Sequence, residues 1–207
     1  MTDAPFFQSA ATWDQRYSDP DFVFGTEPNA YLADQAGRLQ PGGRALAVAD
    51  GEGRNSVWLA RQGLLVDAFD ISPVGVEKAR RLASDAGVDV AHHVASCDDW
   101  AWREEAYDYV VAIFVQFADP DMRDRLFVNM ARALKPGGLL VLQGYTPRQL
   151  EYKTGGPGVL SHLYTEDMLK SAFAGLRIVD LRSYDALLAE GSRHSGMSAL
   201  VGMVARK

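Results

Sequence analysis

Short apolar segments alternate with amphipathic segments along most of the chain. Apolar runs of about four to eight residues bounded by turn residues predict strands, and apolar residues spaced three or four apart predict helices. The segment 107–114 (YDYVVAIF) is nearly all apolar, which is typical of a strand buried on both faces of a sheet. The first five predicted strands are 44–49, 64–69, 88–95, 107–114 and 139–143, and the predicted helices after residue 44 are 55–62, 73–86, 122–134 and 165–173.

The end of the chain breaks this alternation. Two further predicted strands, 176–187 and 199–204, are joined by only about ten residues. A parallel pair needs a crossover of roughly a dozen residues or more, so we expect these strands to form an antiparallel hairpin. Together the patterns predict an α/β fold: a Rossmann-like, doubly wound seven-stranded sheet, mostly parallel, with an antiparallel C-terminal hairpin. Ligands of such sheets bind outside the carboxyl ends of the strands.

The start of the chain has no clear periodicity. The segment 13–29 (WDQRYSDPDFVFGTEPN) mixes aromatic residues with Asp, Pro and Gly, and it predicts an irregular N-terminal cap. Pro28 and Asn29 can open a short helix that runs to about Leu39, before Pro41-Gly42-Gly43 stops it. We expect a single domain over 1–207, with a cap segment 1–40 and a Rossmann-like core 44–207.

Composition and charge narrow the classes of partner. The chain has 207 residues and a formal net charge of −6, and nucleic acids and anionic membranes attract basic surfaces instead. Cys97 is the only cysteine, so no internal disulfide can form and a reducing compartment fits best. The first ten residues lack a leader pattern, and no apolar stretch approaches the roughly 18 residues of a membrane span. We expect a cytoplasmic protein with no nucleic-acid or membrane partner, and the oligomeric state stays open.

A glycine-containing turn, 50–55 (DGEGRN), lies between the first predicted strand and its helix. Gly51 and Gly53 would let a ligand approach the backbone, although such a turn can also be a simple connector. Asp70 follows nineteen positions after Gly51, at the end of the second strand, where an acidic side chain can bind ribose hydroxyls or stabilise a helix N-terminus. Because Ser56 replaces the third glycine of a dinucleotide fingerprint, a mononucleoside ligand is favoured.

Several motifs together resemble a known family over nearly the whole chain. They are WDQRY with FGTEPN, GEGRNSVWLA, DIS, LKPGG, TGGPG and EGSRHSG. In these motifs the chain resembles the class I S-adenosylmethionine-dependent methyltransferases, and more narrowly their tellurite-resistance and thiopurine methyltransferase-like group. The resemblance implies S-adenosylmethionine (SAM) as cofactor and S-adenosylhomocysteine (SAH) as product. It also implies in-line methyl transfer to a small-molecule thiol, metalloid, hydroxyl or amine acceptor.

The resemblance also implies a cofactor site. The two glycines of the loop would line the methionine portion, Asp70 the ribose, Ile71 and Cys97 the adenine, and 114–116 the wall near the sulfonium. Aromatic cap residues could close over the sulfonium, although plain packing is the alternative. The expected cofactor-binding residues are Trp13, Tyr17, Phe24, Asp50, Gly51, Gly53, Arg54, Asp70, Ile71, Ser96, Cys97, Asp98, Phe114 and Gln116.

Three positions depart from the family pattern. Ala47 and Ala49 stand where the family usually has an acidic residue and a first glycine, and Ser96 stands where it usually has Asp. Asp50 or Asp98 could supply the missing carboxylate contact to the amino group or adenine of the cofactor. Arg54 could pair with the cofactor carboxylate or face solvent.

Candidate acid–base residues lie near the carboxyl end of the predicted sheet. Tyr145 and His194, with Glu190 nearby, could orient the acceptor or remove its proton, and His194 could instead be a surface residue of the hairpin. His92 and His93 lie inside a strand without further ligands, so no metal site is expected. Two alternatives stay open: an NAD(P)-dependent oxidoreductase, and a non-catalytic Rossmann-like binding protein that has lost its cofactor.

Overall fold

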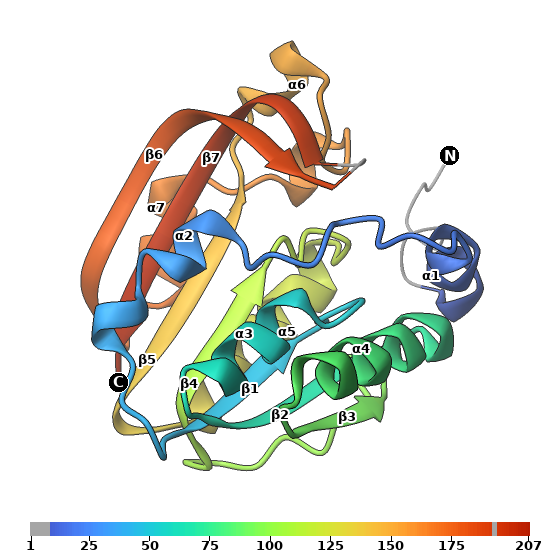
Figure 1. Ribbon diagram of the computed structural model, residues 1–207. Helices are drawn as coiled ribbons and strands as arrows, with labels where there is room; N and C mark the ends of the chain where they lie inside the picture. The colour runs from blue at the N-terminus through green and yellow to red at the C-terminus, as the bar shows by residue number, and fades with distance from the viewer. Residues whose placement is uncertain (1–8, 192–193) are drawn as a thin grey trace. The chain divides into compact units, whose positions relative to one another are not determined.

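The computed structural model describes residues 9–191 and 194–207 and contains a seven-stranded sheet (Figure 1). The strand order is β3-β2-β1-β4-β5-β7-β6. β1 pairs with β2, β2 with β3, and β4 with β5, all in parallel, whereas β7 runs antiparallel to β5. The predicted fold class is therefore confirmed. The strands are β1 (Arg44–Val48), β2 (Leu65–Asp70), β3 (Val90–Val94), β4 (Tyr107–Ile113), β5 (Leu134–Tyr145), β6 (Arg177–Glu190) and β7 (His194–Arg206).

The chain divides into two compact units, and each is described by itself. The described part of the first unit is 9–101 with 190–191, and that of the second is 102–189 with 194–207. The single domain expected over 1–207 stays a prediction. The helices of the first unit are α1 (Ala10–Tyr17), α2 (Ala30–Ala33), the 3₁₀ helix η2 (Ala36–Arg38), α3 (Arg54–Arg61) and α4 (Pro73–Ala86). The helices of the second unit are α5 (Pro120–Ala133), α6 (Gln149–Tyr152), the 3₁₀ helix η3 (Leu160–His162) and α7 (Glu166–Ala172).

Helices α3 and α4 cover β1–β3 in the first unit (Figure 1). The apolar residues of β1 and the end of β2, such as Leu46 and Phe69, are fully buried, and Phe69 stacks on Trp100 with ring centroids 4.7 Å apart. The side chain of Ser72 accepts a hydrogen bond from the Gly75 amide at the start of α4, and Pro73 occupies the first turn, where no amide partner is needed. The carboxyl ends of β1 and β2 thus lead directly into the N-termini of two helices.

Helix α5 packs on β4 and β5 in the second unit. The Asp119 side chain caps this helix by accepting from the Met122 amide, and Phe127 and Met130 are buried on its inner face. β4 is buried along most of its length, as its apolar sequence predicts.

The N-terminal cap is irregular over 18–29, as predicted, and differs from the prediction on both sides of this segment. Residues 10–17 form helix α1, because the Ser9 side chain caps it through the Thr12 amide and Tyr17 is buried on its inner side. The helix expected over 28–39 is instead the four-residue α2, capped by Asn29, followed by the 3₁₀ turn η2. Both helices are too short for periodicity to reveal.

Three strands are longer than predicted. β5 begins at Leu134, so the LKPGG sequence starts the strand instead of only ending the helix before it. β6 and β7 extend towards each other, and the connection between them is shorter than expected. Among the described residues, no helix has the length and apolarity that a membrane crossing requires.

Candidate functional site

The glycine loop after β1 has an unusual backbone. Ala49, Gly51 and Gly53 have φ values of 49°, 62° and 94°, all in the left-handed region that glycine tolerates best. The Asp70 carboxylate braces this loop: Oδ2 accepts from the Gly51 amide at 2.9 Å, and Oδ1 accepts from the Ser72 amide at 2.9 Å. The structure thus brings together the loop and the acidic residue that the sequence places nineteen positions apart.

Asp50 is a buried carboxylate with one unsatisfied oxygen. Its Oδ1 accepts from the Ser56 amide at 3.2 Å, whereas Oδ2 is shielded from solvent and has no hydrogen-bond partner among the described residues. Burial raises the pKa of Asp50 to about 7 and that of Asp70 to about 6. These two carboxylates therefore titrate near neutral pH.

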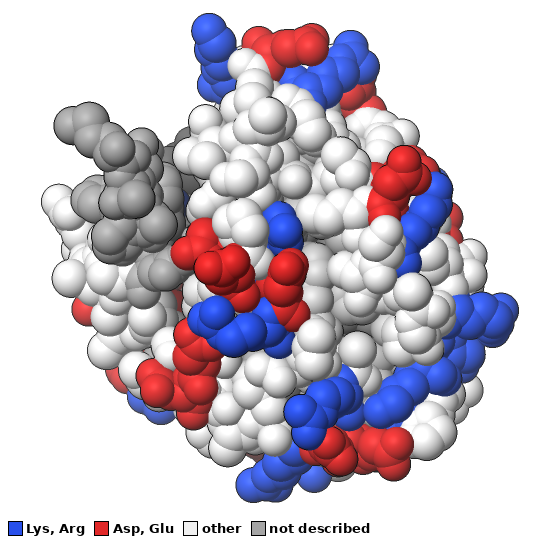
Figure 2. All heavy atoms as spheres, turned by 180° about the vertical axis from the view of Figure 1, so that it is seen from behind, with Lys and Arg blue, Asp and Glu red and all other residues white. Residues whose placement is uncertain are grey.

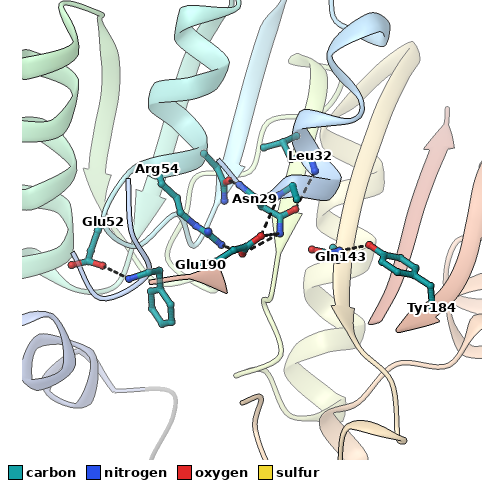
Figure 3. A network of polar contacts seen from close by, with 10 residues as sticks. Asn29, Leu32, Glu52, Arg54, Gln143, Tyr184 and Glu190 are labelled. Carbon is teal, nitrogen blue, oxygen red and sulfur yellow. Dashed lines mark hydrogen bonds and ion pairs between the residues drawn. The ribbon is translucent and has the colours of Figure 1, made fainter. Parts of the chain in front are cut away.

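Arg54 does not face solvent, so that alternative is wrong. Its side chain is 7% exposed, and Nη2 donates to Glu190 Oε2 at 2.7 Å (Figure 3). Glu190 also accepts from the Asn29 side chain and the Ala30 amide, so both of its oxygens are engaged and it orients other groups instead of acting as a free base. Arg54 Nη1 is buried and has no partner among the described residues.

The three aromatic cap residues that the sequence predicts at the cofactor site pack around Tyr17. Trp13 stacks on Tyr17 with ring centroids 5.6 Å apart, and Phe24 meets the Tyr17 ring edge-on at 6.2 Å. Tyr17 lies on the glycine loop, since a Cβ added to Gly51 would be 2.7 Å from its hydroxyl oxygen. Burial raises the pKa of the Tyr17 phenol well above its usual value, so it stays protonated.

A buried ion pair that sequence reasoning missed fixes the cap to this loop. Lys78 Nζ on α4 lies 2.5 Å from Glu52 Oε1, and both side chains are buried. The same ammonium group donates to the carbonyls of Asp19 and Asp21, at 2.8 and 2.6 Å. Glu52 Oε2 in turn accepts from the Phe24 amide at 3.3 Å (Figure 3). The sequence offers no local signal for this pair, because its partners lie far apart along the chain.

The residues expected near the adenine lie around the end of β3. Ser96 Oγ donates to Asp99 and accepts from its amide, so this hydroxyl is used within its own turn. Asp98 is exposed, and Cys97 is buried with a thiol pKa raised by that burial. Ile71 is partly buried directly after Asp70. Of these residues, Cys97 interacts electrostatically with Asp70.

The second unit holds the other expected site residues. Phe114 stacks on Tyr145 with centroids 4.7 Å apart, and Tyr145 is fully buried. The Gln116 amide bonds to the main chain of Tyr145 and His162, so it ties these two segments together. His194 begins β7, and its side chain lies outside the described part of the structure. Among the described residues, no group of three or more His, Cys, Asp or Glu could hold a metal ion.

Comparisons with known proteins show similarity to methyltransferases. A methyltransferase-domain family model matches residues 45–138. The chain is 36% identical over 107 residues to the ubiquinone biosynthesis O-methyltransferase of Xanthomonas axonopodis pv. citri, covering 51% of this chain and 44% of that protein. It is 30% identical to the tRNA N(3)-methylcytidine methyltransferase Mettl2 of Drosophila melanogaster, covering 88% of this chain and 66% of that protein.

Solved structures share the fold at low sequence identity. A SAM-dependent methyltransferase from Methanosarcina mazei superposes with a TM-score of 0.71 at 19% identity, covering 87% of this chain and 98% of that chain. TehB from Haemophilus influenzae gives 0.70 at 17% identity, with coverage of 96% and 66%. A protein described in the conversion of a disulfide into a thioacetal during echinomycin biosynthesis gives 0.75 at 22%, with coverage of 96% and 93%.

The chain spans less than two thirds of the length of the curated relatives that it matches. The matched segment 45–138 nevertheless contains the glycine loop, Asp70 and Phe114. Residues 45–138 therefore match a methyltransferase-domain family model, and the chain shares its fold with a SAM-dependent methyltransferase of known structure.

Proposed function

We propose that this chain binds SAM and transfers its methyl group to a small-molecule acceptor. The observation that carries the proposal is a pair of unmatched groups beside the glycine loop: the acceptor Asp50 Oδ2 and the donor Arg54 Nη1, both buried. An unpaired buried polar group is costly, about 1–3 kcal/mol and more for a charged one. Such groups persist where a ligand satisfies them.

The amino-acid end of SAM matches this pair. It carries an ammonium group, which would donate to Asp50, and a carboxylate, which would accept from Arg54. Asp50 would then take the place of the acidic residue that the family usually has at the position of Ala47. Both atoms are shielded from solvent, so we expect the aromatic cap residue Tyr17, which lies on Gly51, to move when the ligand enters.

Asp70 would bind the ribose. Each of its oxygens accepts one amide hydrogen bond from the loop, and a carboxylate oxygen can accept two. The remaining acceptor positions suit a pair of vicinal hydroxyls. The residues present therefore fit an adenosyl amino acid.

The protein would contribute orientation and exclusion of water. SAM supplies a methyl group already activated on a sulfonium, so no acid or base is needed for its departure. The Asp50–Arg54 pair and Asp70 would fix the two ends of the cofactor, and the cap aromatics would exclude water. Tyr145, stacked on Phe114, is our candidate for orienting the acceptor, and His194 is the candidate base.

Calorimetric titration with two ligands tests the proposal. SAH carries the amino-acid end, whereas 5′-deoxy-5′-methylthioadenosine lacks it. We expect Asp50→Asn to weaken SAH binding about 10- to 100-fold, the usual value of a charge-assisted hydrogen bond, and to leave methylthioadenosine binding unchanged. Asp70→Asn should weaken both ligands. Asp85→Asn, an exposed position on α4, is the matched control and should weaken neither.

The same titration separates the alternatives. Binding of NAD(P) without SAH would support an oxidoreductase. Failure of the unmodified protein to bind SAH, methylthioadenosine or NAD(P) would support a non-catalytic protein and overturn our proposal. Membership of the tellurite-resistance and thiopurine-like group is part of the proposal, and TehB supports it only at the level of the fold. Screening thiol, tellurium, selenium and hydroxyl acceptors with labelled SAM tests that group.

A further inference from the structure

The second unit contains a hollow beside α6. It has a volume of about 460 Å³ and is lined by Gln149, Leu150, Lys153, Leu163 and three glycines of the TGGPG segment, Gly155, Gly156 and Gly158. Small-molecule sites usually measure about 300–1,000 Å³ and combine apolar walls with a few fixed polar groups. The hollow is thus large enough for a small organic ligand.

The loop around this hollow is held in place by a buried glutamine. Gln149 is 2% exposed, and its Nε2 donates to Thr154 Oγ1 at 3.0 Å and to the Gly155 carbonyl at 3.2 Å. Its Oε1 accepts from the Ala199 amide of β7 at 2.8 Å. Two of these bonds hold the loop to α6 and the third holds α6 to β7, so the walls of the hollow are formed before a ligand arrives.

Several donors in the lining of the hollow have no hydrogen-bond acceptor among the described residues. Among the described residues, Lys153 is the only charged one in the lining, and no hydrogen bond or ion pair of its ammonium group is found within this part of the chain. The amides of Gly155, Gly156 and Gly158 also donate no hydrogen bond to any described residue. A lysine beside free amides of a glycine-rich turn is an arrangement that binds anions.

The other walls are apolar, and one borders a candidate site residue. Leu150 and Leu163 line the hollow, and Leu163 packs in the same apolar cluster as Tyr145. Gly156 lies against the Tyr145 ring, since a Cβ added to this glycine would be 3.1 Å from Tyr145 Cδ2. A ligand in the hollow would therefore meet an apolar surface close to Tyr145.

We propose that this hollow binds a small organic molecule that has an apolar body and a single carboxylate, with Lys153 and the glycine amides holding the carboxylate. One cation balances one negative charge, whereas a phosphate dianion would keep an unmatched charge. This binding site does not depend on the proposed function.

A matched pair of probes tests the site. 2-Naphthoate and its uncharged amide, 2-naphthamide, have nearly the same shape, and both fluoresce. We expect the unmodified protein to bind naphthoate more tightly than the amide. Lys153→Met should weaken naphthoate binding about five- to tenfold, the effect of a partly solvated charged hydrogen bond, without changing binding of the amide. Lys153→Arg should restore most of the affinity.

The control is Lys170→Met, because Lys170 lies on the surface of α7 in the same unit and is absent from the lining of the hollow. This variant should bind both probes like the unmodified protein. Equal binding of the two probes, an unchanged affinity in Lys153→Met, or no binding at all would overturn the proposal. The titration needs no SAM, so loss of naphthoate affinity in Lys153→Met supports the site even if SAM binding fails.

Discussion

The carboxylate of Asp50 makes cofactor affinity sensitive to pH. Burial raises its pKa to about 7, so in the free protein it is largely protonated at pH 6. A protonated Asp50 cannot pair with the ammonium group of SAM, which keeps its charge below a pKa of about 8. We expect the association constant for SAH to rise several-fold between pH 5.5 and 7.5, measured by calorimetry.

Asp70 also titrates in this range, with a pKa of about 6, so the control must separate the two groups. Asp50→Asn should flatten the upper part of the pH profile and leave the part near pH 6, where Asp70 ionises. A profile with the same slope around pH 7 in both proteins would rule out Asp50 as the titrating group.

The same buried charge should lower stability. The folded-state pKa of Asp50 is raised above its unfolded value of 3.8. The favourable contribution of this carboxyl group to the free energy of unfolding is therefore complete below pH 3.8 and is lost as pH rises through about 7. At pH 8 the ionised group therefore costs stability. We expect Asp50→Asn to raise the free energy of unfolding at pH 8 by on the order of 2 kcal/mol, and to have little effect at pH 4. Urea titrations at both pH values measure this; a loss of stability at pH 8 would contradict it.

Local sequence patterns predicted some of these residues and could not predict others. Asp70 and Gly51 were paired by strand position and spacing, and they share a hydrogen bond. The Arg54–Glu190 pair joins residues 136 positions apart, and Glu52 and Lys78 meet through the packing of the cap. Such contacts depend on the tertiary fold, so no window of the sequence contains them.

At the scale of elements, Gly53 sets how closely α3 approaches α4. A Cβ added at Gly53 would be 2.8 Å from the Cα of Ala79 on α4, a backbone atom that cannot move aside cheaply. Gly87, at the end of α4, also has a positive φ but has nothing within 4 Å of its added Cβ. We expect Gly87→Ala to cost about 1 kcal/mol from backbone strain alone.

The substitution Gly53→Ala should cost more than Gly87→Ala, by a further 1–3 kcal/mol or so, because it adds a steric conflict to the strain. Denaturant unfolding of the two variants measures the difference. Equal losses would show that α3 and α4 can separate without cost, and that the close approach is unimportant.

The N-terminal cap depends on the buried ion pair between α4 and the loop. Lys78→Met removes the cation and leaves Glu52 buried without its partner, which typically costs about 3–5 kcal/mol. The double variant Lys78→Met/Glu52→Gln has no unpaired charge and should recover part of this loss. Thermal unfolding measures both variants, and a double variant no more stable than the single one would count against a charge-pair origin.

Element prediction succeeded where segments are long and bounded by clear turn residues. The α4 helix was predicted with the observed bounds 73–86, because Pro73 and Gly87 mark its ends. Helix α1 was missed because it has eight residues and only one fully buried side chain. The start of β5 was missed because Pro and Gly in 134–138 normally interrupt a strand.

At the scale of the whole molecule, charge bears on the class of acceptor. One relative, Mettl2, is named for methylating tRNA, so a nucleic-acid acceptor is the main competitor to a small molecule. The chain has 21 basic and 27 acidic residues. On the face shown in Figure 2, many lysine and arginine side chains lie beside aspartate or glutamate, and a run of basic side chains follows the lower right of the view.

Binding to a nucleic acid depends on neutralising phosphates with basic side chains, and its affinity falls steeply with salt. With a net charge of −6, we expect no saturable binding of total tRNA at 150 mM salt in a filter-binding assay. Labelled SAM should likewise transfer no methyl group to tRNA under conditions in which it methylates a small acceptor. Two results together would instead make the nucleic acid the acceptor. The first is saturable tRNA binding whose log association constant falls steeply and linearly with log salt concentration, and the second is labelled methyl groups in the tRNA.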